Sequence, residues 1–218
     1  MNDSTHTLRA PPAARPPAAS AAGRYDMVLL AASAGGLQAL DRVLSGLPAD
    51  FPVPVAVVLH RTPGRPELLP TILARRTGLR VKGAEDGETL RPGTVYVAPA
   101  DRHLVVRPDL TLSLIDGHRI RFVRSSANPL FDSAAYALDG RVVAVVLTGG
   151  GTDATDGVQV VKGMGGVVIA QDPATAEHSG MPGAAVATGA VDYVLPLDEI
   201  APALLRLVAP AVPVAAEG

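Results

Sequence analysis

Three uninterrupted apolar runs stand out along the chain, and each leads into a different polar residue. The runs, with the residues that close them, cover positions 27–33, 53–60 and 142–153. Runs of Val, Leu and Ala without alternation are typical of strands buried on both faces, which occur in parallel sheets covered by helices. The pattern therefore predicts that Ser33, His60 and Asp153 follow strands of one sheet, at the carboxyl edge where open α/β sheets bind ligands.

Segments with apolar residues at helical spacing alternate with these runs. The sequence predicts helices at residues 37–47, 66–78, 128–138, 156–164, just after Pro182 and at 197–208, and further strands at 167–170 and 191–195. Pro66 is expected in the first turn of the second helix, and Asn128 and Asp156 are expected to cap the third and fourth. This alternation indicates a doubly wound, three-layer α/β/α fold with a mostly parallel sheet.

The stretch between residues 79 and 120 breaks this regularity. Short apolar segments there are separated by Pro, Asp and Gly, and they cover residues 95–97, 103–106 and 110–114. Segments of this length between turn residues are typical of antiparallel strands. We therefore expect a small antiparallel excursion from the parallel sheet.

Length and composition favour one domain with two loose ends. The chain has 218 residues, of which 48% are hydrophobic, and this is enough for one core. Residues 24–208 carry the periodic pattern and form the predicted catalytic domain. Residues 1–23, rich in Ala and Pro, are predicted to be a disordered tail, and residues 209–218 a flexible one.

Charge and residue content disfavour several classes of function. A net charge of −2 and 3% aromatic residues provide neither the basic stripe nor the stacking surfaces of a nucleic-acid-binding protein. The absence of cysteine excludes disulfides and thiolate metal sites. No apolar stretch is long enough to span a bilayer, and prolines interrupt the region where a secretory signal would have its apolar core. We expect a cytoplasmic protein with no nucleic-acid partner and no membrane insertion.

Ser33, His60 and Asp153 are the residue types of a nucleophilic triad. A serine hydroxyl attacks a carbonyl efficiently when a histidine accepts its proton and a carboxylate orients that histidine. Small residues at positions 31–32 and 34–36 would let a substrate approach backbone amides at the start of the next helix. The serine turn lacks the G-x-S-x-G pattern, so the α/β-hydrolase superfamily is disfavoured.

Each of these residues also has an ordinary structural interpretation. Ser33 and Asp153 could cap the helices that follow them, and His60 could be a hydrogen-bonded structural residue. The glycine-rich segments 32–36 and 148–152 could instead cradle the phosphates of a nucleotide, but neither G-x-x-x-x-G-K-[ST] nor G-x-G-x-x-G follows the first strand. The coincidence of all three polar residues at strand ends favours the triad.

A series of segments, in order along the chain, carries a resemblance to a known family. They cover residues 32–37, 85–88, 90–99, 101–104, 129–131, 133–135, 147–149, 170–172 and 180–182. From about residue 25 to residue 207 the sequence resembles the catalytic domain of the CheB-type protein-glutamate methylesterases of bacterial chemotaxis. The resemblance implies a doubly wound α/β fold in which Ser33 is the nucleophile, His60 the general base and then acid, and Asp153 the group that orients His60.

The resemblance also implies what the protein acts on. It points to a serine-type carboxylic-ester hydrolase that demethylates γ-glutamyl methyl esters on a chemoreceptor-like protein, and it leaves open deamidation of glutamine. It implies neither a metal nor an organic cofactor. Such enzymes usually carry a receiver domain before the catalytic domain, whereas only the Ala/Pro-rich tail stands there in this sequence, so a catalytic domain without a receiver is expected.

Positions around the triad depart from the family pattern. Ala31 and Ala34 stand where the family has Gly and Thr, and Gly150 and Ala154 stand where it has Met and Gly. Position 34 therefore lacks a hydroxyl beside the nucleophile. This difference motivates an alternative function, a catalytically weakened module that binds a receptor or signalling partner without turnover.

Overall fold

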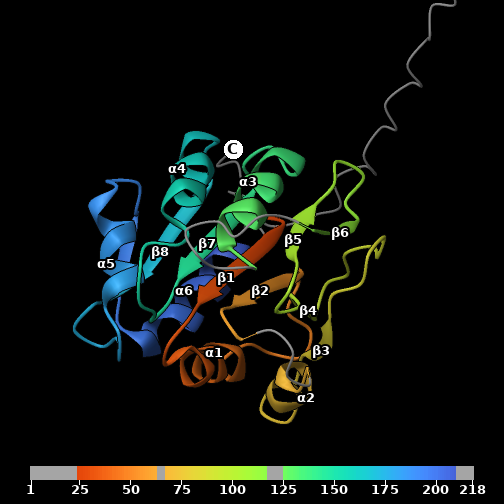
Figure 1. The fold of residues 1–218 in the computed structure, drawn as a ribbon, viewed down its shortest axis with the longest axis horizontal. Coiled ribbons are helices and arrows are strands. Elements are labelled where there is room, and N and C mark those ends of the chain that lie inside the picture. The colour runs from red at the N-terminus through yellow and green to blue at the C-terminus, as the bar shows by residue number, and fades with distance from the viewer. Residues whose placement is uncertain (1–23, 63–66, 117–124, 210–218) are drawn as a thin grey trace, which may run out of the picture.

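Strands and helices alternate along the chain, as the sequence predicts (Figure 1). The structure is a computed structural model that describes residues 24–62, 67–116 and 125–209. The strands are β1 (Met27–Ala32), β2 (Val55–Leu59), β3 (Arg80–Gly83), β4 (Thr94–Val97), β5 (His103–Val106), β6 (Leu112–Ile115), β7 (Val142–Val146), β8 (Val167–Gln171) and β9 (Tyr193–Leu195). The helices are α1 (Gly36–Ser45), α2 (Leu69–Ala74), α3 (Ala127–Ala137), α4 (Thr155–Gly163), α5 (Gly180–Ala187) and α6 (Leu197–Val208).

A parallel sheet is the centre of the fold. Within the described residues it has seven strands in the order β3-β4-β2-β1-β7-β8-β9, and β5 and β6 form a separate antiparallel hairpin. The chain adds strands on one side of β1 up to β4, and then crosses back to add β7, β8 and β9 on the other side. The order therefore reverses between β1 and β7, and ligands of doubly wound sheets bind at the carboxyl ends beside such a reversal. The predicted fold class is confirmed.

Helices cover both faces of the sheet (Figure 1). Helices α1, α2 and α6 bury residues such as Leu44 and Leu204 against one face. Helices α3, α4 and α5 and the β5–β6 hairpin bury residues such as Phe131, Val158 and Leu104 against the other. Strands β1, β2 and β7 are buried along their whole length, and this is why their sequences are uninterrupted apolar runs.

The antiparallel prediction for residues 79–120 holds for β5 and β6 but is wrong for the segment 95–97. That segment lies in β4, which pairs in parallel with both β2 and β3. The sequence analysis missed β3 altogether, because this strand lies at the edge of the sheet and has no fully buried residue. A short, charged edge strand has no apolar run by which it could be recognised.

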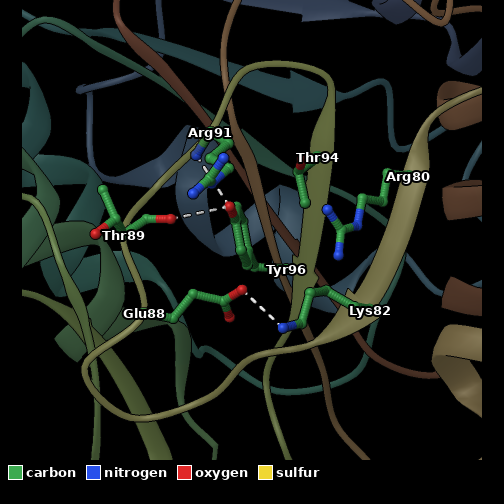
Figure 2. Close-up of a pocket in the computed structure, with 7 residues that line it drawn as sticks. All are labelled: Arg80, Lys82, Glu88, Thr89, Arg91, Thr94 and Tyr96. Carbon is green, nitrogen blue, oxygen red and sulfur yellow. Dashed lines mark hydrogen bonds and ion pairs between the residues drawn. The ribbon is translucent and has the colours of Figure 1, made fainter.

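Charged side chains occupy the edge of the sheet at β3 (Figure 2). Arg80 and Lys82 line a pocket of about 360 Å³ together with Arg91, and the Lys82 ammonium pairs with Glu88 at 2.7 Å. The Tyr96 hydroxyl accepts a hydrogen bond from the Arg91 amide at 2.9 Å, which ties the preceding loop to β4. Charges on an edge strand hinder its pairing with another chain. The lining includes the first and third residues of both β3 and β4, so the pocket lies along this edge of the sheet.

Two helix caps differ from the sequence prediction. Ser126, not Asn128, caps α3, and its hydroxyl accepts a hydrogen bond from the Asn128 amide. Ala154 precedes α4 in the left-handed region at φ 75°, and Asp156 lies inside the first turn. In both cases the observed cap already turns the chain into the helix, and the predicted cap falls two positions too late.

Other boundaries shift by a few residues. Helix α2 begins at Leu69, and the predicted start at Pro66 lies outside the described residues. Helix α5 begins at Gly180, before Pro182. Proline fits the first turn of a helix because backbone N–H groups there have no partner within the helix, so the N–H that proline lacks is not needed. Of the predicted tails, residues 1–23 and all of 209–218 except Ala209 also lie outside the described residues. No helix in the described part of the chain is long and apolar enough to cross a bilayer.

Candidate active site

Ser33 and His60 occupy equivalent places at the ends of neighbouring strands. Strands β1 and β2 pair in parallel up to Ala32 and Leu59, and each of the two polar residues comes one position later. The His60 amide donates to the Ala32 carbonyl at 3.1 Å, so the ladder continues past the last paired residues. The predicted position of both residues at the carboxyl edge of the sheet is confirmed.

The turn that carries Ser33 is held by backbone hydrogen bonds. The Ser33 amide donates to the Thr148 carbonyl at 3.0 Å, and the Gly36 amide donates to the Ser33 carbonyl at 2.8 Å. Gly35 adopts φ 71°, a backbone conformation that residues other than glycine rarely take. A Cβ atom at this position would also lie 2.7 Å from the Glu177 carboxylate. The chain therefore turns sharply into α1 and leaves Ser33 partly exposed.

The loop after β7 passes directly beside Ser33. A Cβ atom on Gly149 would lie only 2.8 Å from the Ser33 Cβ, so the backbone can come this close only because position 149 is glycine. The Gly149 amide donates to the His178 carbonyl at 2.9 Å, and its carbonyl accepts from the Met181 amide at 2.8 Å. These bonds fix the start of the loop that leads to Asp153.

Asp153 is buried and bonded to His60. One carboxylate oxygen, Oδ2, lies 2.7 Å from His60 Nε2 and also accepts the Ala127 amide at 2.7 Å. The other oxygen, Oδ1, accepts the Ser126 hydroxyl at 2.5 Å. The structure thus brings together two of the predicted residues, which are separated by 93 positions in the sequence.

The surroundings of Asp153 keep it ionised. Burial acts to raise the pKa of this carboxyl, but hydrogen bonds from His60, the Ala127 amide and Ser126 outweigh burial, so the pKa lies below its ordinary value. The charge is therefore present throughout the neutral pH range. An ionised carboxylate beside Nε2 favours a proton on that nitrogen and leaves Nδ1 of His60 as the acceptor.

The structure also bears on the ordinary interpretations of these residues. Helix α1 is capped by Gly35 without any side-chain hydrogen bond, so the Ser33 hydroxyl does not cap it. Asp153 does not cap α4 either, because its carboxylate bonds to the start of α3. Within the described residues no hydrogen bond joins the Ser33 hydroxyl to His60. Bonds of this kind are often long in enzymes without substrate and shorten when the reacting complex forms.

Three further residues at the site were missed by the sequence analysis. Ser126 and the Ala127 amide hold Asp153, but they are the cap and the first residue of α3 and differ in no way from an ordinary helix start. A serine at that place is a cap signal, and it could have been recognised as one. His103, whose ring accepts the Ser126 amide, stands in one of the segments that carry the family resemblance, but no role was assigned to it.

A groove of about 500 Å³ opens beside His60. Its lining includes exposed leucine and isoleucine side chains from α1 and from the start of α2, namely Leu37, Leu68 and Ile72. Arg61 also lines the groove, donates to the Ala98 carbonyl at 2.7 Å and pairs with Glu67. The residues that the structure describes contain no group of three or more carboxylates and histidines placed to hold a metal ion.

Comparison with known proteins gives consistent matches over most of the chain. A family model described as CheB methylesterase matches residues 28–204. A protein-glutamate methylesterase/protein-glutamine glutaminase of Caulobacter vibrioides is 42% identical over 195 residues, which are 88% of this chain and 56% of that protein. The protein-glutamate methylesterase FrzG of Myxococcus xanthus is 42% identical over 184 residues, or 84% of this chain and 54% of FrzG. The chain thus spans just over half the length of these relatives.

A solved structure matches the fold. The crystal structure of the Thermotoga maritima CheB methylesterase catalytic domain superposes with a TM-score of 0.81 and 39% sequence identity. The match covers 84% of this chain and 99% of that one. The similarity therefore extends over nearly the whole of that domain.

Proposed function

This chain belongs to the CheB methylesterase family, and from this membership and the geometry of its site we propose that it hydrolyses γ-glutamyl methyl esters of a chemoreceptor-like protein. In this proposal Ser33 is the nucleophile, His60 the general base and acid, and Asp153 the orienting carboxylate. The observation that carries it is the 2.7 Å contact between His60 Nε2 and the buried Asp153 carboxylate, beside the strand end that holds Ser33.

The reaction would proceed through an acyl-enzyme. His60 Nδ1 takes the proton of the Ser33 hydroxyl as its oxygen attacks the ester carbonyl carbon, and Asp153 stabilises the resulting imidazolium. When the tetrahedral intermediate collapses, the carbon–methoxy bond breaks and the proton passes from His60 to the departing oxygen, releasing methanol. A water molecule then attacks the acyl-enzyme by the same route and frees the glutamate carboxylate and Ser33.

Backbone amides would stabilise the oxyanion. Ala34 supplies no hydroxyl, but the amides of Ala34 and Gly35 donate no hydrogen bond within the described part of the chain, and they lie at the start of α1. Amides at this place suit a developing negative charge. The same machinery would deamidate a glutamine side chain, with ammonia leaving in place of methanol, and the names of the relatives support this as a second activity.

The groove supports a protein substrate. Exposed apolar side chains beside His60 suit a substrate whose glutamyl ester extends from an apolar surface. We further propose that the reaction takes place in the cytoplasm. Fractionation of cells that produce the protein would test this location.

The central test is methanol release from receptor membranes with radiolabelled methyl esters. Ser33→Ala should abolish release while leaving the thermal transition nearly unchanged, because a small, partly exposed side chain is trimmed. Ser45→Ala is the matched control, since it removes a hydroxyl from the exposed end of the helix that follows Ser33. Unchanged methanol release by the Ser33 variant would refute the assignment.

The alternative is a binding module with weak catalysis, and the missing hydroxyl at Ala34 favours it. Ala34 is exposed, so threonine fits there without entering the core. One added oxyanion donor is worth up to roughly 10²–10³-fold in rate. If the parent protein binds receptor without releasing methanol and Ala34→Thr does not accelerate release, the binding module is the better description.

A further inference from the structure

A chain of buried hydrogen bonds leads from Asp153 to a residue that the mechanism above does not use. The Ser126 hydroxyl donates to Asp153 Oδ1 at 2.5 Å, and the Ser126 amide donates to Nδ1 of His103 at 3.1 Å. Ser126 is fully buried, and His103 is 1% exposed. Bulk water therefore cannot replace either partner if the other is removed.

These bonds determine the orientation of the Asp153 carboxylate. The hydroxyl of Ser126 holds Oδ1, and the amide of Ala127 holds Oδ2, which also faces His60. Because the two donors come from adjacent residues and engage different oxygens, the carboxylate cannot rotate without losing one of them. The direction of the bond to His60 thus depends on where the start of α3 lies.

His103 is placed to fix the start of α3. It is the first residue of β5, in the hairpin outside the parallel sheet, and its Nδ1 carries no proton because it accepts a backbone N–H. A second bond, from the Val106 amide to the Ser133 hydroxyl at 3.0 Å, joins the same strand to the middle of α3. These two hydrogen bonds tie β5 to the start and to the middle of α3, and the one at His103 is next to the residues that hold Asp153.

The backbone before α3 is strained. Ser125 is fully buried at φ 64°, in the left-handed region that favours glycine. Such conformations persist where the surroundings impose them, and they cluster at functional sites. The strain is an independent sign that this segment is held in one arrangement, and the bond to His103 is immediately next to it.

We propose that His103 and Ser126 are positioning residues, which hold the Asp153 carboxylate in the direction that orients His60. This inference rests on the proposed function, because it assigns a role within the same triad. Neither residue lines the groove beside His60, so their loss should lower kcat and leave KM nearly unchanged.

Two substitutions of His103 separate the acceptor from the bulk of the side chain. His103→Leu removes the acceptor, whereas His103→Asn places an amide oxygen near the position of Nδ1. His103→Leu and Ser126→Ala should each lower kcat for methanol release from methylated receptor membranes by roughly 10- to 100-fold, a range typical of outer partners that orient a functional histidine. His103→Asn should recover most of the activity.

The matched control is Ser133→Ala, which cuts the other bond between β5 and α3. It should loosen the hairpin to a similar degree and leave kcat within twofold of the parent. A spectroscopic readout accompanies the kinetics: the proton shared by His60 and Asp153 should give a low-field NMR resonance that shifts in Ser126→Ala and His103→Leu but not in Ser133→Ala.

The outcomes distinguish this inference from the proposed function. If Ser33→Ala is inactive while folded His103→Leu and Ser126→Ala keep kcat within twofold and the resonance in place, the positioning role is refuted and the triad stands. If Ser33→Ala is active, the proposed function itself fails. If His103→Leu does not fold, the comparison of Ser126→Ala with Ser133→Ala still tests the positioning role. Both variants remove one hydroxyl on or next to α3.

Discussion

Replacing Asp153 by asparagine tests how the carboxylate acts on His60. Oδ2 accepts two donors, His60 Nε2 and the Ala127 amide, whereas Oδ1 accepts the Ser126 hydroxyl. An asparagine that turned its NH₂ group toward His60 would also point it at the Ala127 N–H, donor against donor. We therefore expect the amide oxygen to take the place of Oδ2 and the NH₂ group to face Ser126, whose oxygen can accept it.

This orientation preserves the tautomer of His60 and removes only the charge. A hydrogen bond to a charged group contributes about 1.5–3 kcal/mol and one between neutral groups about 0.5–1.5 kcal/mol, so the imidazolium loses roughly 1.5 kcal/mol. The full attraction between charges about 4 Å apart, at an effective dielectric constant of about 20, is about 4 kcal/mol and sets the upper bound. At about 1.4 kcal/mol for each tenfold, kcat should fall by roughly 10- to 10³-fold.

The expected loss is smaller than in serine proteases. There the same substitution costs roughly 10⁴-fold, because the amide favours the wrong tautomer of the histidine. In this protein the Ala127 amide opposes that arrangement. The difference between the roughly 10⁴-fold loss in serine proteases and the smaller loss expected here measures the effect of the Ala127 N–H.

The assay combines methanol release with ¹⁵N NMR of the His60 ring, whose nitrogen shifts report which nitrogen carries the proton. Asp198→Asn is the control for removing a charge, because Asp198 is an exposed carboxylate on α6 that pairs with Arg42. A loss of roughly 10⁴-fold together with a proton on Nδ1 would contradict the role given to Ala127. A loss below about tenfold would reduce Asp153 to a structural residue.

Three further predictions concern other parts of the chain. Gly149→Ala should lower turnover by up to about 10²-fold, because its Cβ would lie 2.4 Å from Met181 Sδ and 2.8 Å from the Ser33 Cβ and would displace the nucleophile turn. Gly163→Ala, with open space at its Cβ, should leave turnover unchanged. Equal turnover in both variants would contradict the close approach. Burial and a neighbouring carboxylate raise the pKa of Asp132, so its charge destabilises the folded state above that pKa. Asp132→Asn should therefore raise the free energy of unfolding at pH 7, and chemical denaturation should show this gain shrinking as the pH falls through the raised pKa and absent below the ordinary carboxyl value. Removing residues 1–23, predicted to be a disordered tail, should leave stability and turnover unchanged, and a loss of more than about 1 kcal/mol would show that the segment packs on the domain.

The elements that could be predicted from sequence are those with an unambiguous apolar pattern. Helix α6 agrees with its predicted range of 197–208, and the runs ending near Ser33 and His60 became buried parallel strands. The pattern failed at β3, whose polar residues suit an edge, and at β4, which was predicted to belong to the antiparallel excursion. Which strands pair, and in which direction, depends on tertiary packing, so it cannot be predicted from the length of a segment.

The candidate site divides in the same way. The residue types Ser33, His60 and Asp153, and the fact that each follows a strand, were readable along the chain because strand direction alone sends them to one edge. The residues that hold Asp153 in place could not be predicted from the sequence. Ser126 bonds to Asp153 from a helix start, and His103 bonds to Ser126 from a hairpin outside the sheet. No spacing in the sequence links these elements.

By itself the sequence determined which segments are buried and which edge of the sheet holds the polar residues, because burial follows from local apolar patterning. Only the tertiary structure decided that Asp153 bonds to His60 rather than capping α4, that the Ala127 amide shares its oxygen, and that the loop backbone passes beside Ser33. These are contacts between residues far apart in the chain. Their geometry depends on how helices and strands pack together, and hydrogen-bond directions and close approaches exist only once that packing is complete.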